Sequence, residues 1–304
     1  MHNDGAHMEF MHHHRTFGER RNGARPATLY LMSATNRFVV VGNPVAHSLS
    51  PVIHARFGAQ CGVALSYEKL LAPLDDFAAT ARTFFAGGGR GANVTLPFKV
   101  EALALAHAAS ERAKLAGAAN MLTARDGRIE ADNADGEGLV GDLTRNLGLA
   151  LRGARIAILG AGGATRGVVG PLLAQAPERL VIANRTFDRA RELVARFAAL
   201  GPVHAAALDR IEGAPFDLVI NATSTSTHGE RLDLPAGLLA PGALVYDMVY
   251  GAPARAFLDR VEARGARVSD GLGMLVEQAA EAFRVWHGMR PVTAAVLAEL
   301  RARP

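Results

Sequence analysis

Short apolar runs and longer amphipathic stretches alternate from Arg37 onward, a pattern typical of strands and helices laid down in turn. Pro97 predicts a helix start, because proline at the first helical position loses no hydrogen bond. The pair Asp126-Gly127 between two short runs predicts a β-hairpin. In this half of the chain we expect strands at 37–42, 64–71, 92–96, 121–125 and 128–131, and helices at 51–60 and 75–85.

A second unit begins near Gly153, where a buried-type strand, a glycine loop, a helix and a second strand follow one another. The apolar residues that follow recur at the spacing of one helix face, which predicts a helix. They are Phe187, Ala190, Leu193, Val194, Phe197 and Leu200. We expect strands at 155–159, 180–183, 216–220 and 243–247, and helices at 164–174, 271–287 and 293–301. No internal repeat interrupts this order, so the pattern predicts an α/β protein with two units.

Length and composition agree with two domains and exclude several classes. The chain has 304 residues, of which 49% are hydrophobic, so disorder is excluded as its main state. No apolar run reaches the ~20 residues that cross a bilayer, so we expect a soluble protein without a membrane partner. Basic and acidic residues number 33 and 29 and are intermixed, which disfavours nucleic-acid binding. The lone Cys61 fits a reducing compartment, and we expect a cytoplasmic location.

The first 35 residues differ from the rest of the chain. They are rich in histidine, show no sustained apolar period and lack the apolar core of a secretory signal. We expect an extension at 1–35 without a fold of its own, with Met32 among the possible starts. Adjacent histidines such as His12–His14 on such an arm bind metal weakly, so no metal site is expected.

The glycine loop is the first motif that carries chemistry. Residues 160–167 (GAGGATRG) follow a strand and open a helix, so free amides and the positive helix end face any anion placed there. Thr165 stands where a strict G-x-G-x-x-G motif has its third glycine, and the helix-packing glycine falls at Gly167. The loop predicts a dinucleotide site, and a tight turn without a nucleotide is the alternative.

The residues after the next strand discriminate between cofactors. An NAD-binding unit ends this strand with an acid that holds the ribose hydroxyls, whereas here Asn184-Arg185-Thr186 and Arg189 follow. A guanidinium forms paired hydrogen bonds with a 2′-phosphate, which a carboxylate would repel. The pattern favours NADP, with solvated arginines on a helix as the alternative.

Lys99 stands out because only three of the 33 basic residues are lysines. Hydride transfer at an alcohol carbon needs a group that exchanges the hydroxyl proton, and arginine cannot do so. The segment 132–136 (DNADG) can supply a carboxylate that orients the ammonium. The alternatives are an exposed helix-start lysine and, for Asp135, a helix N-cap.

Ser48 and Ser50 alternate just before a predicted helix, where their hydroxyls can converge on a small carboxylate. Capping is the alternative, because Ser50 before Pro51 is an ordinary N-cap. His47 is interpreted as structural rather than catalytic.

Nine motifs in order, from about Arg37 to Gly288, closely resemble the shikimate dehydrogenase family: GNPVAHSLSP, GANVTLPFK, LAGAAN, DNADG, GAGGATRG, ANRT, NATS, YDMVY and DGLGMLVEQAAEAF. The resemblance implies reversible reduction of 3-dehydroshikimate to shikimate with NADPH, in aromatic amino-acid biosynthesis. The implied partner is a small-molecule substrate, and a monomer or homodimer is expected.

The resemblance also implies roles for individual residues. Lys99 and Asp135 would act as a catalytic pair at the reacting hydroxyl, with Lys99 as the proton carrier. The substrate would be bound by Ser48, Ser50, Thr95, Asn120, Tyr250 and Gln278. NADP would be bound by Gly160, Ala161, Gly162, Gly163, Ala164, Asn184, Arg185, Thr186, Arg189, Met248 and Gly271.

The implied fold has an N-terminal α/β substrate domain at 36–136 and a Rossmann-like, doubly wound NADP domain at 137–270. Helices at 271–304 would return to the first domain, because Gly271 and Gln278 serve the same cleft.

Two departures from the family pattern are Ala134, where threonine is usual, and residues 225–228 (TSTH), which alter a loop that the resemblance places against the nicotinamide. Two other classes compete with this enzyme. A non-catalytic NADP-binding regulator is disfavoured by the presence of both Lys99 and Asp135, and a methyltransferase by the lack of an acid after the second nucleotide-domain strand. A paralogue that also oxidises quinate or prefers NAD is the nearest alternative, and Arg185 and Arg189 disfavour only the change of cofactor.

Overall fold

The structure is a computed structural model that describes residues 36–211, 215–228 and 231–303. The extension predicted at 1–35, with His12–His14, lies outside the described residues.

Six strands form the first sheet, in the order β2-β1-β3-β5-β6-β4. Strand β5 pairs antiparallel with both of its neighbours, and the other pairs are parallel, so every strand except β5 runs in one direction. The strands are β1 (Arg37–Gly42), β2 (Ser66–Leu71), β3 (Gly89–Val94), β4 (Ala108–Ala109), β5 (Met121–Arg125) and β6 (Arg128–Asp132).

Both faces of this sheet are covered, which explains the unbroken apolar run of β1. Val39 and Val41 join one core cluster with Phe77. Phe38 and Val40 join another on the opposite face, because successive side chains of a strand alternate. The helices of this half are α1 (Ser50–Cys61), α2 (Phe77–Ala86), α3 (Lys99–Leu105) and α4 (Glu111–Ala116).

The predicted hairpin is confirmed between β5 and β6. Its two turn residues have positive φ, 49° at Asp126 and 72° at Gly127. This left-handed pair matches the twist of the two strands, and Asp-Gly adopts it at low cost.

The second sheet is parallel throughout, in the order β12-β11-β10-β7-β8-β9. Chain order reverses between β7 and β10, which is where doubly wound sheets bind their ligands. The strands are β7 (Arg155–Leu159), β8 (Arg179–Asn184), β9 (Val203–Ala207), β10 (Phe216–Asn221), β11 (Leu239–Asp247) and β12 (Arg267–Ser269).

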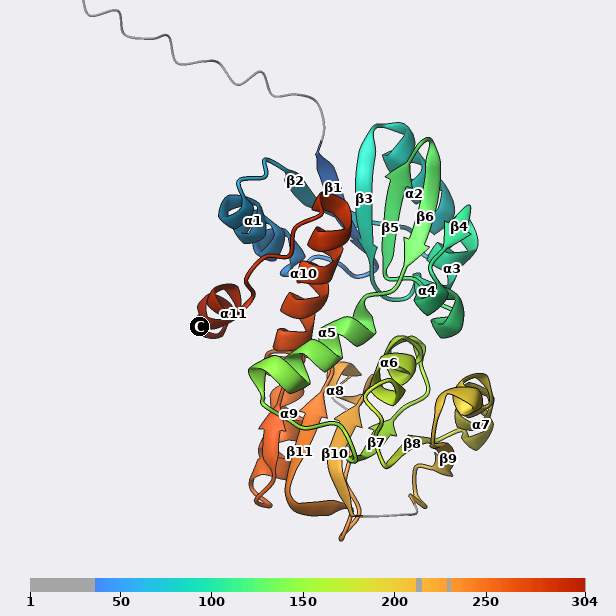
Figure 1. Cartoon of the computed structure of the whole chain (residues 1–304), viewed down its shortest axis with the longest axis vertical. Coiled ribbons are helices and arrows are strands. Elements are labelled where there is room, and N and C mark those ends of the chain that lie inside the picture. Colours follow the sequence, from blue (N-terminus) through green and yellow to red (C-terminus); the bar gives the residue numbers. More distant parts are fainter. Residues whose placement is uncertain (1–35, 212–214, 229–230, 304) are drawn as a thin grey trace, which may run out of the picture. The chain divides into compact units, whose positions relative to one another are not determined.

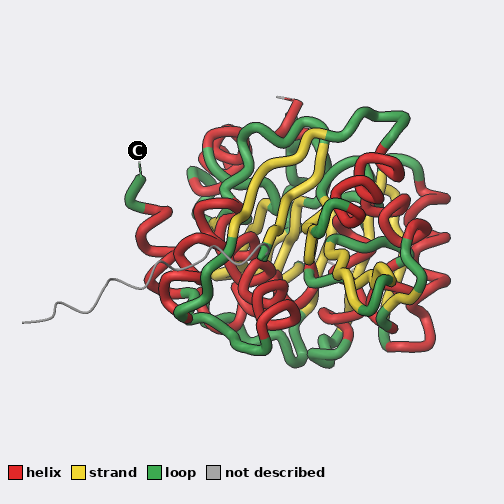
Figure 2. Tube along the Cα trace, turned by 90° about the horizontal axis from the view of Figure 1, so that it is seen from above, coloured by secondary structure: helices red, strands yellow, loops and turns green. Residues whose placement is uncertain are grey.

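Helices lie on both sides of the strands (Figure 2). Ile156 and Ile158 of β7 pack in one cluster with Val168 of α6, and Leu159 packs in the other with Phe257 of α9. The predicted Rossmann-like fold is therefore confirmed. The helical elements are α6 (Gly163–Leu173), α7 (Phe187–Phe197), the 3-10 turn η2 (Ala198–Leu200), α8 (Thr225–His228) and α9 (Ala252–Glu262).

Two helices lie side by side between the sheets, α5 (Asp135–Gly141) and α10 (Leu272–His287) (Figure 1). A Cβ added at Gly138 of α5 would lie 2.8 Å from Cβ of Gln278, so the helices touch closely. Helix α5 continues into a π-helical turn, η1 (Asp142–Asn146). Phe57 of α1 packs with Phe283 of α10 and with α11 (Ala294–Arg301), so the last helices return to the first sheet as predicted.

Several local predictions are wrong. Helix α3 begins at Lys99, so Pro97 lies in the preceding turn. The capping alternatives for Ser50 and Asp135 are excluded, because Leu49 and Ala134 occupy the N-cap positions of α1 and α5.

The predicted apolar face of α7 is also partly wrong, because Phe187 and Leu200 are exposed. Some elements were not predicted at all, namely β4, α4, η1, η2, β9, α8, α9 and β12. No helix among the described residues is long and apolar enough to span a membrane.

Candidate active site

The strand directions of the first sheet bring the predicted substrate residues to one edge. The carboxyl ends of β1, β3 and β6 share this edge, and the antiparallel strand β5 begins there. Ser48, Lys99, Asn120 and Asp135 all follow or precede these strand ends, although they are spread over almost ninety residues. A hydrogen bond from Asn43 N to Leu96 O, 3.0 Å long, ties the loop after β1 to the turn after β3.

Lys99 and Asp135 form an ion pair at this edge. Nζ of Lys99 lies 2.6 Å from Oδ2 of Asp135, and the two side chains are 14% and 3% exposed. The ammonium and the carboxylate are therefore largely withdrawn from water, which strengthens their attraction and holds the amine in one orientation. The carboxylate partner of Lys99 within the DNADG segment is Asp135; Asp132 binds Arg112 instead.

Amide side chains hold Asp135 from the other side. Nδ2 of Asn120 donates to Oδ1 of Asp135 at 2.8 Å and to Oε1 of Gln278 at 2.7 Å. The backbone N of Asp135 donates to Oδ1 of Asn133 at 3.0 Å, and N of Ala134 donates to Oδ1 of Asn120 at 2.8 Å. The structure thus brings Lys99, Asp135, Asn120 and Gln278 into one polar cluster, and Ala134 at the family's threonine position keeps its backbone contact.

The two serines lie together at the start of α1. Their Oγ atoms are 3.2 Å apart, and N of Ser50 donates to Oγ of Ser48 at 3.3 Å. Thr95 packs over Gly42, where an added Cβ would lie 2.4 Å from Cγ2 of Thr95. Burial raises the pKa of Tyr250, and a hydrogen bond from the backbone of Leu49 opposes this shift, so Tyr250 faces the serine loop. His47 is exposed beside these residues.

The glycine loop after β7 leaves room for an anion. Gly160 has φ 107°, and an added Cβ would lie 3.0 Å from the carbonyl oxygen of Ala222, so the close approach of two strands requires glycine. An added Cβ at Gly162 or Gly163 meets nothing within 4 Å. The first-turn amides of α6, which include Gly163 and Ala164, have no helical partner. This donor set fits a pyrophosphate.

The loop after β8 presents two arginines. Asn184 anchors it, since its Oδ1 accepts from N of Ala161 at 3.2 Å and its Nδ2 donates to the carbonyl of Thr186 at 2.9 Å. Arg185 and Arg189 are exposed, and no ion pair engages either one within the described part of the chain. The residues fit an adenosine ribose that carries a phosphate.

Met248 and Gly271 meet at the edge of the second sheet. An added Cβ at Gly271 would lie 2.3 Å from the carbonyl oxygen of Met248, so only glycine lets α10 begin there. The preceding Asp247 is fully buried and accepts from Oγ of Ser226 at 2.6 Å and from Nδ2 of Asn221 at 3.0 Å. It therefore joins the loop after β10 to the loop after β11.

Helix α6 also contacts the catalytic cluster. An added Cβ at Gly167 would lie 3.0 Å from Cβ of Asp135 and 2.9 Å from Oδ1 of Asn133. This glycine therefore packs α6 against the DNADG segment, and the nucleotide loop that opens α6 lies only four residues away. A dinucleotide bound at the start of α6 and a substrate bound beside Lys99 would therefore lie next to each other.

A phosphate-accommodating Rossmann-like unit beside a buried amine–carboxylate pair defines a nicotinamide-dependent oxidoreductase. Three family models match the chain: "Shikimate dehydrogenase substrate binding domain" at 40–122, "Shikimate / quinate 5-dehydrogenase" at 142–229 and "Shikimate 5'-dehydrogenase C-terminal domain" at 271–301. The chain belongs to the shikimate dehydrogenase family.

Individual relatives agree with this assignment. The NADP(+) shikimate dehydrogenase of Laribacter hongkongensis is 55% identical over 270 residues, which cover 88% of this chain and 99% of the relative. A solved structure of an Ael1 enzyme from Pseudomonas putida is 44% identical with a TM-score of 0.82, over 88% of this chain and 98% of that one. The solved structure of shikimate 5-dehydrogenase from Thermus thermophilus in complex with NADP(H) and shikimate is 33% identical with a TM-score of 0.77. The match covers 87% of this chain and 98% of that one.

Sequence reasoning missed the polar residues behind the catalytic cluster. Arg112, Asp132 and Glu281 form an ion-paired group next to it. No signal distinguished Arg112 in a chain whose basic residues are almost all arginines, and no helix was predicted around it.

Proposed function

We propose that the chain catalyses the reversible, NADP-dependent reduction of 3-dehydroshikimate to shikimate in aromatic amino-acid biosynthesis. The observation that carries the proposal is the buried Lys99–Asp135 pair, with Nζ and Oδ2 2.6 Å apart, beside the helix that the glycine loop opens. Such a pair suits an alcohol–ketone interconversion, in which one proton must move with one hydride.

In the reductive direction, Lys99 donates a proton from Nζ to the carbonyl oxygen as that oxygen gains charge. NADPH, when bound, supplies the hydride that makes the carbonyl carbon a CH–OH carbon. Asp135 keeps Nζ aimed at that oxygen and stabilises the ammonium before the transfer. In the oxidative direction, Lys99 takes the hydroxyl proton back.

The remaining roles in the proposal are those that the family resemblance implies. Ser48, Ser50, Thr95 and Tyr250 would hold the substrate carboxylate with neutral donors. Asn120, which donates to Asp135, and Gln278, which accepts from Asn120, would contact the ring hydroxyls. The cofactor would be held at its pyrophosphate by Gly160, Ala161, Gly162, Gly163 and Ala164, at its ribose phosphate by Asn184, Arg185, Thr186 and Arg189, and at its nicotinamide by Met248 and Gly271.

We place the substrate domain at 36–136, the NADP domain at 137–270 and the returning helices at 271–304. The proposed enzyme acts in the cytoplasm as a monomer or homodimer, and the single Cys61 supports a reducing compartment.

The test is initial velocity with shikimate and quinate, each against NADP and NAD, followed at the nicotinamide absorbance. Shikimate with NADP should give the highest kcat/KM. Lys99→Ala should lower kcat by at least about 100-fold and leave NADP affinity unchanged, as expected for loss of a proton carrier. Lys114→Ala is the matched control, because Lys114 is exposed and pairs with Glu111 on its own helix. Normal turnover in Lys99→Ala would remove Lys99 from the mechanism.

A further inference from the structure

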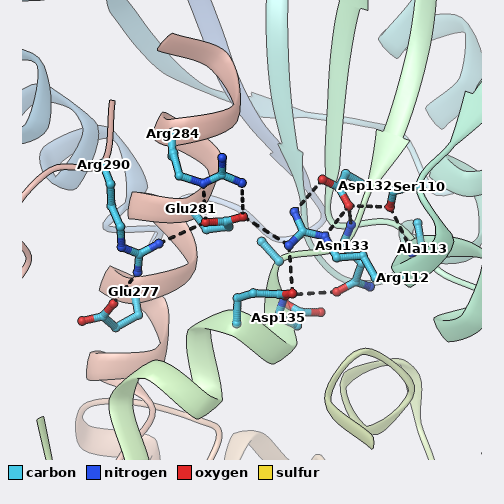
Figure 3. A network of polar contacts seen from close by, with 12 residues as sticks. Ser110, Arg112, Ala113, Asp132, Asn133, Asp135, Glu277, Glu281, Arg284 and Arg290 are labelled. Atoms are coloured by element: carbon cyan, nitrogen blue, oxygen red, sulfur yellow. Dashed lines mark hydrogen bonds and ion pairs between the residues drawn. The ribbon is translucent and has the colours of Figure 1, made fainter. Parts of the chain in front are cut away.

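Arg112 contacts three segments that surround Asp135. From α4 it forms two parallel hydrogen bonds with Asp132, each 2.6 Å long, from Nε and from Nη2. Its Nη1 lies 2.9 Å from Oε1 of Glu137 in α5 and 3.2 Å from Oε1 of Glu281 in α10. Figure 3 shows the guanidinium between Asp132, at the end of β6, and Glu281. One side chain therefore joins β6, α5 and α10.

The first connection runs through the backbone that carries Asp135. Oδ1 of Asp132 accepts from N of Asn133 at 2.8 Å, and Oδ1 of Asn133 accepts from N of Asp135 at 3.0 Å. Burial by itself would raise the pKa of Asp132, but hydrogen bonds from Arg112 and Ser110 outweigh burial and keep that pKa below its ordinary value. The Asp132 carboxylate thus stays charged, and Arg112 holds it.

The other two connections reach Asp135 through helices. Glu137 lies two residues after Asp135 in the first turn of α5. Glu281 lies three residues after Gln278 on α10, and residues at this spacing share a helix face. Gln278 accepts a hydrogen bond from Asn120, which also donates to Asp135. The end of β6, the first turn of α5 and the turn of α10 that carries Gln278 therefore each hold a carboxylate that Arg112 binds.

Arg112 is hard to replace in this position. Among the described residues, Asp132 and Glu137 have no other ion-pair partner, whereas Glu281 is also bound by Arg284 and Arg290. Without the guanidinium, two carboxylates would face each other uncompensated and repel. A lysine would keep the charge, but its ammonium cannot make the two parallel bonds of a planar fork.

We propose that Arg112 is a positioning residue for the Asp135 carboxylate, and so for the Lys99 amine; this inference rests on the proposed function. Arg112 contacts neither reacting group. It acts by fixing the end of β6, the start of α5 and the Gln278 turn of α10 in one arrangement.

The test compares Arg112→Met, Arg112→Lys and Arg284→Met, each alone, with Arg112→Met also combined with Asp135→Asn. Arg112→Met should lower kcat about 10- to 100-fold, because small displacements of catalytic groups cost this much, while KM for NADP changes less than about twofold. The kcat of Arg112→Lys should lie between that of Arg112→Met and that of the unmodified enzyme. Arg284→Met is the matched control, since the one hydrogen-bond partner of Arg284 among the described residues is Glu281 on its own helix, and its kcat should stay unchanged.

The combined variant separates positioning from general stability. If Arg112 acts through Asp135, Arg112→Met should change kcat less than about twofold in the Asp135→Asn background. A fall in kcat that is fully additive with Asp135→Asn would overturn the inference, as would a rise in KM for NADP equal to the loss of kcat. If Arg112→Met does not fold, Arg112→Lys gives the same comparison. Unchanged kcat in Asp135→Asn alone would overturn the proposed function itself, and the inference with it.

Discussion

His54 makes the stability of the protein depend on pH. Its imidazole is fully buried in α1 and stacks on Tyr67 with ring centroids 4.2 Å apart. Burial lowers the pKa of His54 to about 3; the nearby His287 acts in the same direction and the Asn93 side chain opposes it. In the native protein at neutral pH the ring is therefore uncharged.

The magnitude follows from linkage. An unfolded histidine has a pKa of about 6.5, so between that pH and about 3 the unfolded chain holds one more proton than the native protein. The effect of His54 on stability is negligible well above pH 6.5, and stability is lost as the pH falls from there toward 3. Between pH 7.5 and 5.0 the free energy of unfolding falls by about 2 kcal/mol. This value is almost the same for any native pKa of His54 below about 4.

Urea unfolding at pH 7.5 and 5.0 measures this loss through the fluorescence of Trp286, the single tryptophan, whose ring centroid lies 5.5 Å from that of His54. In His54→Phe, which cannot bind a proton, the free energy of unfolding should fall by about 2 kcal/mol less over this interval than in the unmodified protein. His204→Gln is the control, because His204 is exposed on β9. An equal pH dependence in His54→Phe and the unmodified protein would refute the reasoning.

Three further predictions concern the site. Arg185→Ala should raise KM for NADP about 10- to 100-fold and KM for NAD less than about twofold, because charge-assisted hydrogen bonds to the phosphate are lost; equal effects in steady-state kinetics would exclude this role. Gly167→Ala should lower kcat about 10-fold by pressing a methyl group against Asp135. Gly170→Ala, one helical turn on, should retain its rate, because its added Cβ would lie 3.1 Å from the end of the Leu115 side chain and at ordinary contact distance, 3.5 Å, from the Phe197 ring. Asp247→Asn should lower the free energy of unfolding by about 1–3 kcal/mol in urea titrations, since it removes a buried acceptor; a change below about 0.5 kcal/mol would contradict this.

Strand positions were predicted well where apolar residues were continuous. The runs that became β1, β7, β8 and β10 are buried on both faces, and a run of this kind has few alternatives to a central strand. Short elements were missed because their residues carry little periodicity. Strand β4 has two residues and α4 has six, too few to show a clear period.

The capping alternatives offered by local rules fail for a physical reason. Ser50 before Pro51 and Asp135 before a helix both satisfy the N-cap pattern, yet Ser50 lies inside α1 and Asp135 is occupied by Lys99 and Asn120. A side chain that is engaged in tertiary contacts is unavailable to its own backbone. Likewise, Leu200 fits the helical period of α7 but lies exposed after the helix ends at Phe197.

The sequence by itself determined the α/β class, the glycine loop, the arginines that follow β8 and the rarity of a titratable amine such as Lys99, because each is a local property of composition or spacing. Tertiary structure decided which carboxylate meets Lys99, and that Arg112 lies behind the pair. These contacts join residues that are 36 and 169 positions apart, as in Lys99–Asp135 and Arg112–Glu281. They form because a single reversed strand, β5, brings four chain segments to one edge of a sheet, and because α10 returns to pack against α5. Distances between such segments depend on the packing of the whole chain, which no local pattern encodes.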